Sequence, residues 1–132
     1  MPFVVLSIKK ILLMKKWIYI LEDNDDIREI LAYLLTEEKY QVKACQNVTE
    51  FWLQMKKHLP DMVVLDVMLP DGNGLEVCTK IKAEKKTLTI PVMMMSASYR
   101  MMNITKECGA EEFISKPFDI NNFVTKVRRH LH

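Results

Sequence analysis

The chain has 132 residues, of which 49% are apolar and 27% are charged, so its length and composition are those of one globular domain and exclude a disordered or fibrous protein. Its net charge of +2 comes from Lys9 and Lys10, because the rest of the chain has as many acidic as basic side chains. A balanced domain lacks the basic footprint of nucleic-acid binding proteins, so we expect no nucleic-acid binding by this chain alone.

Residues 1–13 precede the first regular pattern of the chain. Lys9 and Lys10 interrupt their apolar runs, so no stretch reaches membrane-spanning length, and neither a charged leader nor a small-residue cleavage site is present. We therefore predict no membrane segment, an N-terminal extension at 1–13 and a domain at 14–132. Three roles stay open for the extension: a dispensable addition, an arm that packs on the domain or on a partner, and a contact with a membrane surface.

Five short apolar segments follow, and each predicts a β-strand. The segments at 17–21, 62–67 and 90–95 are nearly continuous, as in strands buried on both faces, whereas those at 40–45 and 112–114 are weaker. Apolar residues at helical spacing between and after the strands predict helices that carry Ile27, Ile30, Leu31, Leu34 and Leu35; Val48, Phe51, Trp52, Met55 and Leu59; Val77, Cys78 and Ile81; and Ile120, Phe123, Val124, Val127 and Leu131. The pattern at 98–108 is the least regular. Asp26, Asn47 and Asp119 stand at expected N-cap positions.

Regular alternation of strand and helix predicts the fold class. Five strand–helix units give a doubly wound, flavodoxin-like (βα)5 domain with a parallel five-stranded sheet in the order 2-1-3-4-5. Ligands of such sheets bind beyond the carboxyl ends of the strands, where the strand order reverses, here between the first and third strands. Cys45, Cys78 and Cys108 are odd in number and fall on predicted core faces, which favours buried, reduced thiols in a cytoplasmic protein.

Carboxylates gather at the predicted crevice. Glu22 and Asp23 follow the first strand directly, and Asp66 ends the third, within "VVLDVM". Three neighbouring carboxylates repel one another, and a hard dication such as Mg²⁺ relieves that repulsion through oxygen ligands. Asp25 and Asp26 are better explained as a solvated turn and helix start. Asp66 has no such explanation, because an acid in a buried strand requires pairing or a function.

Two further polar residues follow the fourth and fifth strands. Ser96 comes directly after "IPVMMM", and Lys116 lies in "SKPF". Alone, Ser96 is explained equally well as a helix-capping hydroxyl, and Lys116 as a surface charge. Together with a metal, a hydroxyl and an ammonium facing a carboxylate would bind a phosphoryl group.

From Lys15 onward the chain resembles the receiver domain of two-component response regulators. The matching segments are "LEDNDDIREIL", "PDMVVLDVMLPDGNGLEVCTKIK", "IPVMMMSAS" and "GAEEFISKPFD". The resemblance implies that Asp66 accepts a phosphoryl group from a phosphohistidine. It also implies that Glu22, Asp23, Asp66 and the backbone carbonyl of Met68 hold Mg²⁺, that Ser96 and Lys116 bind the phosphoryl oxygens, and that Phe113 turns inward when Ser96 moves. The Lys116–Pro117 bond is expected to be cis by the same resemblance.

Three residues depart from the family's commonest pattern. Glu22 stands where Asp is more frequent, so its longer arm reaches the metal through water or shifts the metal's position. Ser96 replaces Thr but keeps the hydroxyl, so we expect switching to survive. Phe113 has no hydroxyl, so packing alone should hold its outward state. Met68 and Ser98 occupy positions that tune phosphate hydrolysis in the family.

The resemblance predicts a phosphorelay switch and not an enzyme with its own substrate. Expected partners are a sensor histidine kinase or phosphotransfer protein, and a downstream protein or a missing effector domain contacted through the fourth helix, fifth strand and fifth helix, a face that could also form a dimer. The end of the chain after the fifth helix fits either a stand-alone receiver or a fragment of a longer regulator. The main alternative is a degenerate receiver that acts as a phosphorylation-independent interaction module. A haloacid-dehalogenase-type phosphatase would need an acid at Met68, and in a flavodoxin-like electron carrier "EDNDD" would repel the flavin phosphate.

Overall fold

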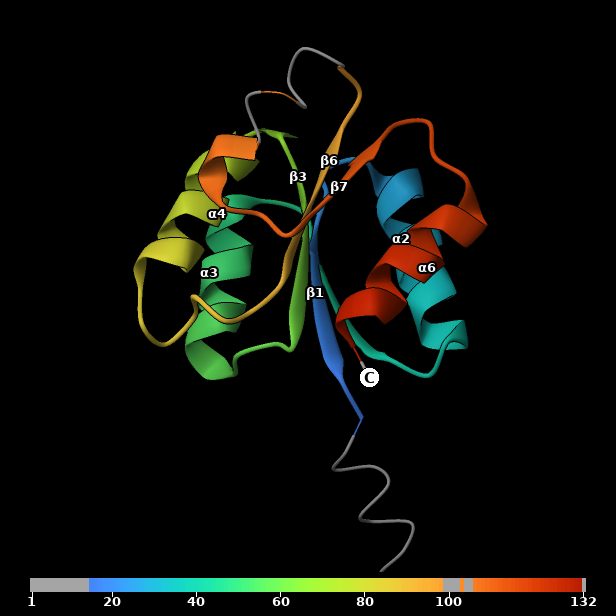
Figure 1. The fold of residues 1–132 in the computed structure, drawn as a ribbon, viewed down its shortest axis with the longest axis horizontal. Helices are drawn as coiled ribbons and strands as arrows, with labels where there is room; N and C mark the ends of the chain where they lie inside the picture. Colours follow the sequence, from blue (N-terminus) through green and yellow to red (C-terminus); the bar gives the residue numbers. More distant parts are fainter. Residues whose placement is uncertain (1–14, 99–102, 104–105, 132) are drawn as a thin grey trace, which may run out of the picture.

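The computed structural model describes residues 15–98, 103 and 106–131. The predicted extension at 1–13 lies outside these residues, as does most of the predicted helix at 98–108. In chain order the elements are β1 (Trp17–Leu21), α2 (Asp25–Glu37), β2 (Gln41–Cys45), α3 (Val48–Lys57), β3 (Met62–Asp66), β4 (Met68–Leu69), β5 (Gly72–Asn73), α4 (Gly74–Ala83), β6 (Val92–Ser96), η1 (Lys106–Cys108), β7 (Glu112–Ser115) and α6 (Ile120–His130) (Figure 1).

Five of the strands form one parallel sheet. Its order is β2-β1-β3-β6-β7, so β6 and β7 are the fourth and fifth strands and the predicted order 2-1-3-4-5 is confirmed. Helices α3 and α4 cover one face of the sheet, and α2 and α6 cover the other (Figure 1). The doubly wound fold class is therefore confirmed as well.

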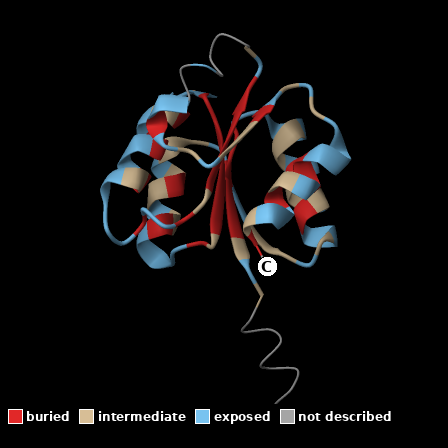
Figure 2. Ribbon diagram, viewed as in Figure 1, coloured by how far each residue is buried: buried red, intermediate tan, exposed pale blue. Residues whose placement is uncertain are grey.

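Each face of the sheet has its own apolar core (Figure 2). In β3, Val63 and Leu65 pack with the α3 and α4 side, whereas Met62 and Val64 pack with the α2 and α6 side. All five residues of β3 are buried, which explains why its sequence is continuously apolar up to the acid at its end. All three cysteines are buried thiols, as predicted.

The apolar stripes of the helices are narrower than their sequence pattern predicts. Ile30 and Ile120 are more than half exposed, and Leu59 lies beyond the end of α3 and is 40% exposed. In α2 only Leu31 and Leu35 are buried, because a helix lying on a sheet turns little more than one side toward it. None of the described helices combines the length and the apolar character that a membrane crossing demands.

One predicted N-cap is wrong and two are confirmed. Helix α2 begins at Asp25, and Asn24 Oδ1 accepts a hydrogen bond from the backbone N–H of Ile27 at 3.0 Å, so Asp26 lies in the first turn. At that position the negative charge of Asp26 still interacts favourably with the helix dipole. Asn47 caps α3 and Asp119 caps α6, as expected.

A short hairpin that was not predicted follows β3. Strands β4 and β5 pair antiparallel, Met68 with Asn73 and Leu69 with Gly72. At its tip the Asp71 carboxylate accepts hydrogen bonds from the backbone N–H groups of Val48 and Thr49, at 2.8 and 3.1 Å. The hairpin is thereby tied to the N-terminus of α3, and Asn73 caps α4 directly after it.

Candidate functional site

Strand register brings three carboxylates to one edge of the sheet. Leu21 of β1 pairs with Leu65 of β3, so Glu22 and Asp66 are the next residues along the two neighbouring strands. Glu22, Asp23 and Asp66 each offer an oxygen, and these oxygens lie within 4.8 Å of one another. The three acids selected from the sequence thus form one cluster, at the carboxyl ends of the strands where the order of the sheet reverses.

Lys116 follows the edge strand β7, and its side chain reaches this cluster. Its Nζ lies 2.5 Å from Glu22 Oε1 and 3.4 Å from Asp66 Oδ2. The register of β6 and β7 pairs Ser96 with Ser115, and the Lys116 backbone N–H then donates to the Ser96 carbonyl at 2.8 Å. The Lys116–Pro117 bond is cis, as expected. Lys116 is therefore part of the carboxylate cluster and not the surface charge that its sequence alone also allowed.

The pKa of Glu22 is raised by its surroundings. Its side chain is fully buried, and burial raises its pKa. The hydrogen bond from Lys116 lowers the pKa of Glu22, but the neighbouring Asp66 raises it again, and the net result is a raised pKa. One ammonium thus compensates three carboxylates incompletely. Their oxygens offer the hard donor set of Mg²⁺, which would supply the missing positive charge.

Arg28 holds the loop that carries Glu22 and Asp23. Its Nη1 donates to the carbonyl oxygens of Glu22 and Asp23, at 3.0 and 3.3 Å, while Nη2 lies 2.5 Å from Asp25 Oδ1. The role of Arg28 was not predicted from the sequence, because its guanidinium binds backbone carbonyls, which have no sequence signature. The spacing of three residues between Asp25 and Arg28, which allows an ion pair on a helix, was a weak indication of it.

Gly74 permits the close approach of α4 to the third strand. A Cβ at this position would lie 2.1 Å from the carbonyl oxygen of Asp66, and the Gly74 N–H donates to the carbonyl of Val67 at 2.8 Å. The first residue of α4 is therefore packed against the backbone that carries the Asp66 carboxylate. In the sequence the glycines of "LPDGNG" indicate only a turn, because the contact that requires one of them is tertiary.

Ser96 and Phe113 are not part of the carboxylate cluster, and each has its own contacts. Ser96 is buried, and its Oγ donates to the Ser98 carbonyl and accepts from the Ser98 N–H, both at 3.1 Å. Phe113 is half-buried and packs on the core of the α3 and α4 side, next to Met94 in the register of β6 and β7. The Met68 side chain is 70% exposed, and the part of its carbonyl in metal binding stays a prediction.

Comparison with known proteins agrees with this geometry. Residues 18–128 match the family model described as the response regulator receiver domain. The chain is 30% identical over 117 residues to the phosphate regulon transcriptional regulatory protein PhoB of Escherichia coli, covering 87% of this chain and 51% of that protein. It is 33% identical over 111 residues to the response regulator ArlR of Staphylococcus aureus, covering 84% and 50%. The chain thus spans about half the length of these curated relatives.

Two solved structures share the fold closely. One is a crystal structure of a response regulator from Chloroflexus aurantiacus, with a TM-score of 0.84 and 28% identity, covering 89% of this chain and 98% of that one. The other is the receiver domain of a signal transduction histidine kinase from Syntrophus aciditrophicus, with a TM-score of 0.82 and 30% identity, covering 88% and 89%.

Proposed function

Since the chain belongs to the response regulator receiver family of two-component signalling, we propose that its function is to accept a phosphoryl group on Asp66 and to change partner binding in response. The proposal rests on the cluster of Glu22, Asp23 and Asp66, in which the Lys116 ammonium lies 3.4 Å from the Asp66 carboxylate. A buried acid between a potential metal site and a fixed cation is suited to attack on phosphorus.

The proposed step is a transfer from a phosphohistidine. An Asp66 oxygen attacks phosphorus, the P–N bond breaks, and the imidazole leaves with the electron pair, so that Asp66 becomes an acyl phosphate. Glu22, Asp23, Asp66 and the Met68 carbonyl would hold Mg²⁺, which supplies charge neutralisation for the transferring oxygens when bound. Lys116 would neutralise a further phosphoryl oxygen, and this would weaken its present pairing with Glu22.

The same proposal includes the response of the molecule. Ser96 Oγ would exchange its hydrogen bonds with Ser98 for one to the phosphoryl group, and Phe113 would move further into the space that Ser96 leaves. Phe113 lies in β7, and Ser96 pairs with Ser115 of the same strand. The surface that a downstream protein, an effector domain or a second copy would read is therefore the predicted one, made of the segment at 98–108, which includes η1, together with β7 and α6. The phosphodonor would be a sensor histidine kinase or a phosphotransfer protein. The thiol state of the three cysteines favours a cytoplasmic location for these events.

Acetyl phosphate with Mg²⁺ tests the role of Asp66 directly. We expect the mass of the wild-type protein to rise by one phosphoryl group, and Asp66→Asn to remain unmodified. Asp26→Asn is the matched control, because Asp26 is an exposed acid outside the cluster, and it should be modified like the wild type. Equal modification of Asp66→Asn and the wild type would refute the assignment.

A degenerate receiver remains the second candidate, and the short contact of Lys116 with Glu22 favours it, since an engaged ammonium is less available to a phosphoryl group. Titration calorimetry with millimolar Mg²⁺ separates the two. We expect one binding site in the wild type and loss of binding in Asp23→Asn. Absence of Mg²⁺ binding to the wild type would favour the degenerate receiver.

A further inference from the structure

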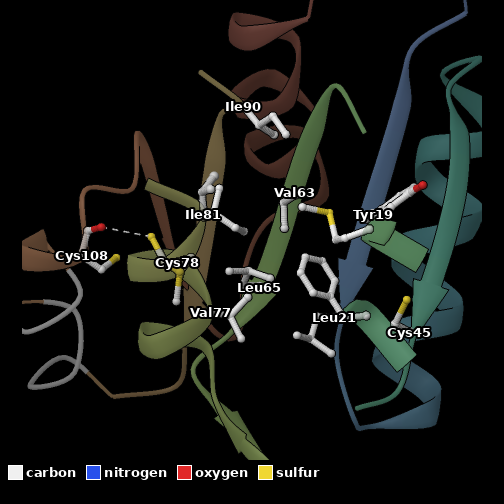
Figure 3. Packing of buried hydrophobic residues seen from close by; sticks show 14 of the residues in the cluster. Tyr19, Leu21, Cys45, Val63, Leu65, Val77, Cys78, Ile81, Ile90 and Cys108 are labelled. Atoms are coloured by element: carbon white, nitrogen blue, oxygen red, sulfur yellow. Dashed lines mark hydrogen bonds between the residues drawn. The ribbon is translucent and has the colours of Figure 1, made fainter. Parts of the chain in front are cut away.

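Two of the three cysteines lie against each other outside the carboxylate cluster. Cys78 belongs to α4 and is fully buried, and Cys108 ends η1 and is 8% exposed. The Cys78 thiol donates to the Cys108 carbonyl oxygen at 3.4 Å and also hydrogen-bonds to the Cys108 side chain. Figure 3 shows the two side chains together at one end of the core, with Cys45 at the other end beside β2.

The backbone holds the two segments together through a second contact one helical turn along α4. Gly109 has a φ of +90°, which glycine adopts readily, and a Cβ there would lie 3.3 Å from Lys82 Cγ. The Lys82 ammonium in turn pairs with Glu111 and donates to the Ile90 carbonyl at 2.7 Å. The turn that follows Cys108 is thus packed on α4, so the two segments are held together by more than one weak hydrogen bond.

The environment makes the two thiols unequal. The hydrogen bond from Cys78 outweighs burial and, with the backbone N–H groups of Ala110 and Cys108, lowers the pKa of Cys108 to about 7. The same hydrogen bond and burial raise the pKa of Cys78. Near neutral pH Cys108 is therefore the better nucleophile of the two. It is 8% exposed and lies between the exposed residues Glu107 and Gly109, so it is close to solvent.

We propose that Cys78 and Cys108 are an oxidation site of this protein, at which hydrogen peroxide produces a reversible disulfide between α4 and η1. The Cys108 thiolate attacks one peroxide oxygen, the O–O bond breaks, and the products are a sulfenic acid and hydroxide. The Cys78 sulfur then attacks the Cys108 sulfur, the S–O bond breaks, and water leaves with the Cys78 proton. Two thiols lose two electrons in total, and the peroxide gains them.

The disulfide would join α4, which begins beside Asp66, to η1, which connects β6 and β7 along the chain. Helix α4 starts at Gly74, which is hydrogen-bonded to Val67 beside Asp66, and η1 lies between the strands of Ser96 and Phe113. A covalent link would restrain the segment that connects β6 and β7, so that it could move less relative to α4. This consequence rests on the proposed phosphorylation of Asp66, whereas the oxidation itself does not.

Thiol mapping tests the oxidation without any phosphodonor. The folded protein is treated with hydrogen peroxide, denatured, alkylated and analysed by peptide mass spectrometry. We expect two of the three thiols to be lost, a linked peptide pair containing Cys78 and Cys108, an alkylated Cys45, and full recovery with dithiothreitol. Three alkylated thiols, a link that includes Cys45, or a link between two chains would overturn the proposal.

Variants assign the roles of the two sulfurs. Cys45→Ser is the matched control and should form the same disulfide. Cys78→Ser keeps a hydrogen-bond donor beside Cys108 but cannot form a disulfide, so it should accumulate a dimedone-reactive sulfenic acid at Cys108. A dimedone adduct at Cys45 in its place would contradict the order of attack.

The coupling to phosphorylation is measured separately. Oxidised and reduced wild-type protein are compared in acetyl phosphate modification, with oxidised and reduced Cys78→Ser as controls. We expect the oxidised wild type to be modified several-fold more slowly, and the variant to show no such difference. Equal rates for both wild-type forms would refute the coupling while leaving the mapped disulfide intact, and no modification of either form would instead refute the function proposed for Asp66.

Discussion

Of the glycines of this chain, Gly74 is the one at which an added Cβ should destabilise the fold most. A Cβ added at Gly74 would lie 2.1 Å from the carbonyl oxygen of Asp66. This oxygen belongs to the backbone, so it cannot move away by a change of side-chain rotamer. We expect Gly74→Ala to lower the free energy of unfolding by about 2–3 kcal/mol or more, because α4 or the end of β3 must shift. Urea unfolding measures the loss.

Gly72→Ala is the control for this prediction. A Cβ at Gly72 would meet Val48 Cγ2 at 3.2 Å, and this side-chain methyl can move by a few tenths of an ångström. A loss of less than about 1 kcal/mol is expected. Similar losses in both variants would show that the contact of Gly74 with Asp66 is not what requires glycine.

Lys116 sets the charge of the carboxylate cluster. Its ammonium neutralises part of the charge of Glu22 and Asp66, so it competes electrostatically with a bound cation. Removing one unit charge about 4 Å from a dication should change the free energy of binding by about 2 kcal/mol, even at the dielectric constant of water. We therefore expect Lys116→Met to bind Mg²⁺ roughly thirtyfold more tightly in calorimetry. Weaker binding in the variant would mean that Lys116 organises the carboxylates more than it repels the cation.

Among the elements, β7 and α6 are joined by an ion cluster around Glu112. Its carboxylate lies 3.2 Å from Lys126, 3.4 Å from Arg129 and 3.0 Å from His130. Burial alone would raise the pKa of Glu112, but the hydrogen bonds to His130 and Lys126 and the charge of Arg129 outweigh it, and the pKa is lowered. The cluster therefore stabilises the folded state only while Glu112 is ionised.

The pH dependence of Glu112 follows from this direction. Its pKa is about 4.5 in the unfolded chain and lower in the folded protein, so its contribution is complete above pH 4.5 and is lost as the pH falls through the folded value. We expect Glu112→Gln to unfold about 1–2 kcal/mol more easily at pH 7. The deficit should shrink below about pH 4.5, where the wild type loses the same interaction. Glu107→Gln, which removes an exposed acid of η1, should be as stable as the wild type at pH 7.

Regular elements could be predicted from the sequence because their patterns are local. The buried strand β3 shows itself by continuous apolar residues, and α6 by Phe123, Val124 and Val127 at helical spacing. The hairpin of β4 and β5 has strands of two residues, which have no periodicity to detect. The N-cap of α2 was misread by two residues, since Asn24, Asp25 and Asp26 are all acceptable caps and only the backbone turn selects among them.

From the sequence we could predict which residues of the candidate site lie together, because the ends of the strands determine their positions. Glu22, Asp66 and Lys116 meet because parallel strands deliver their last residues to one edge. Which partner each side chain takes was beyond the sequence. The 2.5 Å contact of Lys116 with Glu22 joins residues 94 positions apart, and the hydrogen bonds of Ser96 with Ser98 depend on one rotamer.

The carboxylate cluster also couples the site to the stability of the entire domain. It joins the ends of β1 and β3, which pair at the centre of the sheet, and through Lys116 it includes the edge strand β7. Both apolar cores pack on these strands, so a ligand that binds only the folded cluster should stabilise the domain as one unit.

Mg²⁺ should therefore raise the unfolding temperature of the protein. At a free concentration of one hundred times Kd, a ligand specific for the folded state adds about 2.7 kcal/mol to the free energy of unfolding. We expect thermal denaturation followed by circular dichroism to show this gain in the wild type and to show it reversed by a chelator. Asp23→Asn should show little of it, because one of the three oxygen donors is lost. Sodium chloride at equal ionic strength controls for screening, which acts on every exposed charge, and an equal gain in that salt would assign the effect to screening and not to a metal held by the cluster.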